Sequence, residues 1–343
     1  MTPPIDGYVF RTDLTILEQI IDSAFCAARG EEPRITAARL FRGHQLEVLA
    51  QCGDPASAQM VTGQTLGTPP VGLSYYSAMP GTLQNIYNRA VVNHGLTPND
   101  TTELPSHLVG SKLALTDETL KAAVQSVSRG LLNRPRVQRT AGREILYLQN
   151  DLALATAWIW MAGTGFRPTF RLGEVRASWI NWLSQSAVIV DKVTDAAHEG
   201  RLVPLAPTLM QTLAAYGAVL ELMSRSQDIS LVARTGAHHA ITGEGPLFFI
   251  IDKRGKVCPL DAQTALTRLP ANWNLPANFC RHRLASRLRE VGCPGIYVQA
   301  LMGHLEQGIQ PFGPDSFLVP SEYLTITRNA IERVLQEDGW RPL

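Results

Sequence analysis

The sequence predicts a mainly α-helical protein with a small antiparallel β-sheet, which is an α+β fold. Two observations lead to this prediction. Over long stretches of the second half, apolar residues recur at three- and four-residue steps, the spacing of a helix that buries one face. Between these stretches come only short runs of alternating or continuous apolar residues, bounded by turn-forming residues, as is typical of short strands.

The bulk composition is that of an ordinary globular protein. The chain has 343 residues, of which 45% are hydrophobic and 18% charged, a length with room for about two domains. No run approaches the roughly 20 apolar residues of a membrane span, and the start of the chain lacks the pattern of a secretion signal. The five cysteines include no CxxC pair. We therefore expect a cytoplasmic protein that needs no membrane, metal or small-molecule cofactor.

The first 140 residues divide into two predicted parts. Residues 1–85 are interpreted as an N-terminal region, and residues 86–140 as a linker followed by a helical segment. The stretch 63–106 is rich in Gly, Pro, Thr, Ser and Asn, which predicts turns and loops. Thr116 is the expected cap of a helix that ends in a basic connector at 131–144, where we place the main domain boundary.

The N-terminal region also carries a possible internal repeat. Residues 42–64 parallel residues 281–304, because each segment has an arginine, a helical pattern, a glycine, a second helical pattern and then GQ or GH. Tyr75 and Tyr76 begin eleven positions after Gln64, at a plausible place for a degenerate nucleophile. Residues 1–85 would then be a decayed second half. Since helix pairs joined at a glycine are common in unrelated proteins, a chance match is the alternative.

Residues 141–343 are predicted to form one domain. Its first helix, at 144–162, ends at Gly163 and Gly165, which places Arg167 on a turn and not on a helix face. Polar residues between the predicted strands at 186–192 and 201–206 indicate that these two strands form a hairpin. The remaining predicted elements are strands at 177–183, 186–192, 201–206 and 245–252, and helices at 207–226, 260–269, 278–292, 295–304 and 321–336.

Side chains suited to phosphodiester chemistry follow one another through this domain. Such chemistry without a metal requires a nucleophile, an acid for the leaving oxygen, a proton acceptor and positive donors for the other phosphate oxygens. An arginine fork binds phosphate in a bidentate manner, and a lysine can protonate a leaving oxygen. The candidates are Arg167 in TGFRP (164–168), Lys192 in the predicted hairpin, Asn278 and Arg281 in NFCRHRLASRL (278–288), His304 in ALMGH (300–304) and Tyr323 in PSEYLTI (320–326).

In this order and context the candidates resemble the catalytic domain of the tyrosine recombinases, or phage-type integrases, over roughly residues 145–335. The resemblance rests on TGFRP after an apolar helix, on RH before an apolar helix and LMGH, and on RLVPL in the strand after Lys192. It implies an integrase-like catalytic core in which Tyr323 attacks DNA to form a 3′-phosphotyrosyl intermediate. It further implies that Arg167 and Arg281 hold the phosphate, while Lys192 and His304 handle protons.

Two features depart from the family pattern. Asn278 stands where the family usually has a histidine, and an amide can bond to a phosphate oxygen but cannot carry a proton. Tyr323 lies nineteen positions after His304, which is longer than the usual spacing, although the insert is rich in Gly and Pro and can loop out. Proton transfer would therefore depend more heavily on His304 and Lys192.

The resemblance implies a site-specific recombinase or integrase of a mobile genetic element, acting on double-stranded DNA as a homotetramer on synapsed sites. Residues 107–140 would then supply the helical contact to DNA. Two alternatives stay open, a catalytically impaired remnant that binds DNA and an enzyme like the type IB topoisomerases. The net charge of +1 gives little support to DNA binding, so the distribution of charge matters more. Basic clusters that could touch DNA are Arg129, Arg134, Arg136, Arg139 and Arg143; Lys253, Arg254 and Lys256; and Arg281, Arg283, Arg287 and Arg289.

Overall fold

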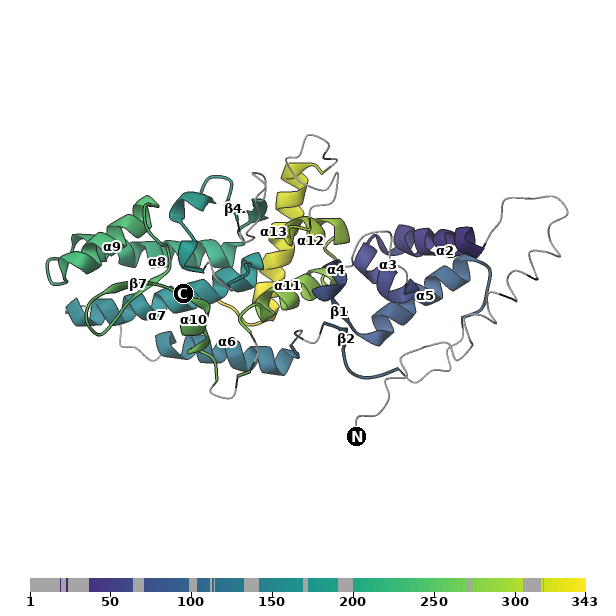
Figure 1. Ribbon diagram of the computed structural model, residues 1–343, viewed down its shortest axis with the longest axis horizontal. Helices are drawn as coiled ribbons and strands as arrows, with labels where there is room; N and C mark the ends of the chain where they lie inside the picture. Colours follow the sequence, from purple (N-terminus) through teal and green to yellow (C-terminus); the bar gives the residue numbers. More distant parts are fainter. Residues whose placement is uncertain are drawn as a thin grey trace.

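The computed structural model shows a mainly helical protein with small antiparallel sheets, so the predicted fold class is confirmed. In Figure 1 the helices α2, α3 and α5, within residues 37–93, gather toward one end of the long axis, and α8 and α9 lie toward the other. The structure describes residues 37–63, 71–98, 104–111, 115–132, 142–168, 172–190, 200–270, 276–304 and 318–343, together with Gln19, Ser23, Leu113, 273–274 and Ser316.

The N-terminal end is a small helical unit with its own apolar centre. Val48, Ala58 and Ala90 are buried there, one from each of three helices. The prediction of turns and loops over 63–106 is wrong at its centre, because Pro80 starts a helix at a position where the missing N–H of proline costs nothing. The elements are α2 (Ala37–Cys52), α3 (Pro55–Thr62), α4 (Val71–Ser74), β1 (Ser77–Ala78), α5 (Pro80–Asn93) and β2 (Val109–Gly110), with β1 and β2 paired antiparallel.

Helices α6 (Asp117–Leu132) and α7 (Gly142–Thr164) follow. The predicted cap of α6 is confirmed, since the hydroxyl oxygen of Thr116 accepts a hydrogen bond from the backbone N–H of Thr119 at 3.4 Å. The apolar face of α6 belongs to the same buried cluster as α7. Helix α6 is therefore packed against the core of the second half.

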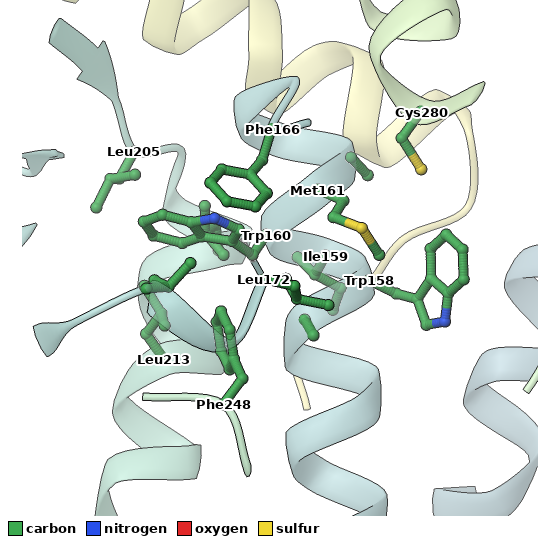
Figure 2. Packing of buried hydrophobic residues seen from close by; sticks show 14 of the residues in the cluster. Trp158, Ile159, Trp160, Met161, Phe166, Leu172, Leu205, Leu213, Phe248 and Cys280 are labelled. Atoms are coloured by element: carbon green, nitrogen blue, oxygen red, sulfur yellow. The ribbon is translucent and has the colours of Figure 1, made fainter. Parts of the chain in front are cut away.

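The main core forms around α7 and buries large aromatic side chains. Trp158, Trp160 and Phe166 are wholly buried, and Phe248 stands edge-on to Trp160 at 6.0 Å between ring centres (Figure 2). Each such side chain contributes on the order of 2 to 3 kcal/mol through removal from water. The indole N–H of Trp158 is also satisfied, because it donates to the carbonyl of Ala265 at 3.0 Å.

Three short strands form the sheet next to the core, in the order β3 (Ile180–Asn181), β4 (Ser186–Ile189), β5 (Arg201–Pro204), all antiparallel. The predicted strand over 177–183 is mostly wrong, because residues 177–179 form a 3-10 helix and only two residues pair. The reason is local: the side-chain oxygen of Asn181 accepts the backbone N–H groups of residues 183 and 184, which turns the chain.

Helix α8 (Pro207–Arg225) matches its prediction, whereas α9 (Leu231–Thr242) was not predicted. The sequence does carry its signals, because Ser230 caps the helix by accepting the N–H of Ala233 at 3.2 Å and Gly243 ends it with φ +80°. A second hairpin, β6 (Phe249–Ile251) and β7 (Val257–Pro259), packs on α7.

The last four helices appear where the sequence predicts them: α10 (Ala262–Leu266), α11 (Phe279–Glu290), α12 (Gly295–Leu301) and α13 (Pro320–Glu337). Arg283 on α11 joins three elements, since it binds Asp338 at 2.8 Å and Asp117 at 2.6 Å. None of the helices in the described part of the chain has the length and apolarity for crossing a membrane. Nor do three His, Cys, Asp or Glu side chains gather as a metal site within that part.

Candidate functional site

The turn after α7 positions Arg167. Gly165 ends the helix in the left-handed region, with φ +59°. A methyl group on Gly165 would lie only 3.2 Å from the side chain of Met302, so the glycine also permits close approach of the LMGH segment. Arg167 follows, half-buried, two residues later.

Arg281 ties this turn to the LMGH segment from the first turns of α11. Its side chain is wholly buried, and it donates to the carbonyl of Gly165 at 2.8 Å and to the carbonyl of Met302. A guanidinium carries five N–H donors in a rigid fork, so these two carbonyls fix its plane. The two sequence motifs therefore meet through one buried cation.

Arg201, at the start of β5, is a second buried cation that the sequence reasoning missed. It donates to the carbonyls of Thr164 at 2.8 Å, Gly165 at 3.2 Å and Leu301 at 2.5 Å. It therefore holds the end of α7 against the end of α12. Its only signal was its place as the first residue of RLVPL, a motif read for Lys192.

Three of the predicted site residues surround one aromatic ring that comes from the N-terminal unit. The ring centre of Tyr75 lies 4.8 Å from the Cζ of Arg281, 5.8 Å from the Cζ of Arg167 and 5.3 Å from the ring of His304. The ring of His282 lies 4.6 Å away. We call Arg167, Arg281, His282 and His304 the basic pocket. Two guanidinium groups and two imidazole rings that lie around one point can bind an anion such as phosphate.

His282 lines this pocket as a neutral group. Its burial, and secondly the positive charge of Arg281, lower its pKa to about 4. Its Nδ1 atom is 2.7 Å from the hydroxyl oxygen of Ser111, which follows β2. His282 therefore adds no positive charge to the pocket at neutral pH.

Tyr323, the predicted nucleophile, faces elsewhere in this structure. Its ring is wholly buried, edge-on to Tyr297 at 5.7 Å, and its hydroxyl donates to the carbonyl of Leu202 in β5 at 2.8 Å. Burial raises the pKa of Tyr323 above its ordinary value, while the nearby charge of Arg201 opposes this shift. The hydroxyl that would attack DNA is thus turned toward the backbone of a strand.

The last two predicted residues have different outcomes. Asn278 caps α11 through its backbone, whose carbonyl accepts the N–H of Arg281 at 2.9 Å. Its side-chain oxygen is buried and receives no hydrogen bond from the described residues. Lys192 lies outside the described residues.

Three members of the third basic cluster, Arg283, Arg287 and Arg289, form ion pairs within the protein. Arg283 binds Asp338 and Asp117, Arg287 binds Glu337 and Glu290, and Arg289 binds Asp54. These side chains are mostly buried in ion pairs between elements. Lys253, Arg254 and Lys256 are exposed in the turn between β6 and β7, and the side chains of the first cluster lie outside the described residues.

Comparisons with known proteins give structural likenesses alone. No protein-family model matches the chain, and no curated protein does. Among solved structures it is similar to the integrase from mycobacterium phage Brujita, with 13% identity over 93% of this chain and 92% of that chain, at a TM-score of 0.34. It is similar to XerA recombinase with 12% identity over 96% and 94%, at a TM-score of 0.35. It is also similar to the Tn1549 transposon integrase in complex with a circular intermediate DNA, with 13% identity over 91% and 93%, at a TM-score of 0.34.

Proposed function

We propose that this protein is a site-specific DNA recombinase that cuts and rejoins strands through a covalent phosphotyrosine link. One observation carries the proposal: Arg167, Arg281 and His304, which are far apart in the sequence, surround a single point next to the LMGH turn. Their types are those that a phosphodiester reaction needs.

In the proposed reaction the arginines hold the scissile phosphate. They neutralise the charge that builds on its non-bridging oxygens as the phosphorus becomes five-coordinate. The hydroxyl oxygen of Tyr323 bonds to phosphorus while the bond to the 5′ oxygen breaks. His304 accepts the phenol proton, and Lys192 donates a proton to the leaving 5′ oxygen. The reverse attack by a 5′ hydroxyl reseals the strand, so the step consumes no nucleotide and calls for no metal.

The proposal requires a conformational change at the start of α13. Tyr323 must exchange the Leu202 carbonyl for a phosphate, which a movement of the first turn of α13 can accomplish. Exchange of two duplexes needs four cleavages, so we further propose that four copies assemble on synapsed DNA. The position of Asn278 in place of a second proton carrier predicts a slower reaction than a histidine would support.

A DNA-binding remnant without catalysis is the second candidate. The buried, hydrogen-bonded hydroxyl of Tyr323 and the amide at Asn278 favour it. Such a protein would keep the basic pocket as a phosphate contact and would form no covalent link.

The deciding experiment is a covalent trapping assay. The full-length protein is incubated with a DNA substrate from the end of its element that carries a 5′-bridging phosphorothiolate, and products are separated under denaturing conditions. We expect a 3′ adduct in the wild type, none in Tyr323→Phe, and a reduction of at least about a hundredfold in Arg167→Gln. Tyr297→Phe is the matched control, because this ring packs against Tyr323 and its variant should keep the adduct.

Each other outcome has a definite meaning. An adduct that survives Tyr323→Phe refutes the assignment of the nucleophile. Binding of the substrate without any adduct supports the remnant. Relaxation of supercoiled DNA without a site preference would assign the chemistry to a topoisomerase-like enzyme.

A further inference from the structure

Tyr75 occupies the centre of the basic pocket, although it belongs to a different part of the chain from the four residues around it. It lies between α4 and β1, over two hundred positions before Arg281. Its ring contacts two guanidinium groups and two imidazole rings, at 4.6 to 5.8 Å. Cation–π contacts of this kind are worth about 0.5 to 2 kcal/mol each, so the ring is held there by the pocket itself.

The segment that carries Tyr75 is seated by a row of contacts on one face of α11. The N–H of Ser77 donates to the hydroxyl of Ser286 at 3.0 Å. Ser111, which follows the strand paired with that of Ser77, has its hydroxyl 2.7 Å from Nδ1 of His282. His282, Ser286 and Arg289 follow one another at four- and three-residue steps, which places them on one side of the helix.

An ion pair and a close approach complete the seat. The carboxylate of Asp54 lies 2.9 Å from Nε of Arg289, and only 8% of each side chain is exposed. Arg289 also covers the ring of Tyr76 at 4.8 Å. Gly295, the first residue of α12, allows the approach, because a Cβ there would lie 2.7 Å from the Cα of Asp54.

A ring in this position excludes a phosphate. A phosphate oxygen binds an arginine nitrogen at about 2.8 Å, so a ligand held by both arginines and His304 must enter the space between them. Tyr75 already touches all three side chains from within that space. The ring carries no net charge, so it cannot offer the guanidinium groups the charge-assisted hydrogen bonds that a phosphate offers.

We propose that residues 71–78, anchored by Asp54, are a built-in inhibitor, which places Tyr75 in the basic pocket and withdraws when DNA binds. This inference rests on the proposed function, because it takes the basic pocket as the phosphate site. DNA shifts the equilibrium toward the open form, since it binds only that form. The apparent affinity for DNA is then lowered by the fraction of molecules that are open.

The test measures binding of a fluorescein-labelled DNA duplex by the full-length protein at fixed, low salt. If about a tenth of the molecules are open, Tyr75→Ala should bind about tenfold more tightly than the wild type. Tyr75→Phe keeps the ring and should bind as the wild type does. Gly295→Ala should also tighten binding, because its methyl group displaces Asp54 without touching the pocket. Gly217→Ala is the matched control, since nothing lies within 4 Å of a Cβ there.

Hydrogen exchange of residues 71–78 measures how firmly this segment is held against α11, independently of any reaction on DNA. These residues should exchange faster in Gly295→Ala than in the wild type, and faster in the wild type once DNA is added. Unchanged exchange on addition of a saturating amount of DNA would overturn the inhibitor.

Arg167→Gln in the Tyr75→Ala background separates the two proposals. If this change weakens DNA binding but Tyr75→Ala alone does not strengthen it, the pocket binds phosphate and the inhibitor is refuted. If the change has no effect on binding, the pocket is no phosphate site and both proposals fail. Loss of the covalent adduct in Tyr75→Phe would make Tyr75 a nucleophile and would also refute its role as a plug.

Discussion

The helix pairs α2–α3 and α11–α12 share a backbone plan but not a burial pattern. In each pair a glycine in the left-handed region follows the first helix, Gly53 at φ +62° and Gly292 at φ +85°. A second such glycine follows the second helix, Gly63 at +67° and Gly303 at +64°. The parallel between 42–64 and 281–304 in the sequence therefore extends to local conformation, whether or not the two arose by duplication.

The same plan places a buried arginine in only one of the pairs. Arg281 is wholly buried and bridges the carbonyls of Gly165 and Met302, whereas Arg42, its counterpart in the first pair, is exposed. The tyrosines behave in the reverse way, since Tyr75 of the first region lies in the basic pocket and Tyr323 of the second is buried against β5. A helix pair becomes part of a site through what packs against it.

The largest expected difference is in the free energy of unfolding, between variants of Arg281 and of Arg42. Arg281→Met removes the donor to the Met302 carbonyl and leaves the Gly165 carbonyl with only the longer bond from Arg201, so it should lower the free energy of unfolding by about 3 kcal/mol. Arg42→Met should change it by no more than about 0.5 kcal/mol, as is usual at exposed sites. Urea unfolding of both variants measures the difference. Equal losses would mean that the cross-link through Arg281 does not stabilise the fold.

The glycines that follow the second helices offer a smaller contrast. Alanine in the left-handed region costs about 1 to 2 kcal/mol in either pair. At Gly303 the added methyl group also lies 3.1 Å from the side chain of Arg201, while at Gly63 nothing lies within 4 Å. Gly303→Ala should therefore be the more destabilising by about 1 kcal/mol in thermal unfolding. A smaller loss than for Gly63→Ala would show that Arg201 moves aside freely.

The smallest expected effect is a pH dependence that His282 contributes in the second pair. His282 has a folded pKa of about 4 against an ordinary value of 6.5, so the unfolded chain binds more protons between these values. Above pH 6.5 His282 is neutral in both states and does not lower the free energy of unfolding. As the pH falls from 6.5 toward 4, the unfolded chain binds a proton that the folded protein does not, so the free energy of unfolding falls. The groups that face it are Arg281, Tyr75, Ser111 and the backbone of Ser74.

His282→Asn should remove part of this loss, on the order of 1 kcal/mol at pH 5. The first pair has Gly43 at the matching position and no titrating group there. Melting temperatures of the wild type and of His282→Asn at pH 7 and pH 5 give the comparison. An equal fall for the two proteins would contradict the role of His282.

Prediction succeeded where local rules apply. The apolar periodicity of 144–162 and the glycines after it were enough to predict α7 and the turn that carries Arg167, because both depend on near neighbours in the chain. The cap at Thr116 was predictable for the same reason. The prediction of a strand over 177–183 failed, because one side chain, Asn181, ends a strand whose apolar pattern would allow it to continue.

The candidate site was predictable as a set of residue types but not as an arrangement. Motif order identified Arg167, Arg281 and His304, and the structure places these three around one point. Nothing in the order of residues showed that Arg201 supports them, because its acceptors at 164, 165 and 301 lie in distant segments. The ion pairs of the basic residues on α11 were hidden for the same reason, since most of their carboxylate partners come from distant segments: the residue before α3, the start of α6 and the end of α13.

Helix positions, the mainly helical class and the candidate chemistry thus follow from the chain's own periodicity, caps and motifs, which act over a few residues. Which tyrosine reaches the basic pocket is settled only by tertiary packing. Tyr75 and Tyr323 are the same side chain chemically. The burial of Tyr323 against β5 and the placement of the Tyr75 segment on α11 depend on contacts between residues 121 and 209 positions apart in the sequence. Such contacts are stabilised by the whole core and leave no periodic trace in the sequence.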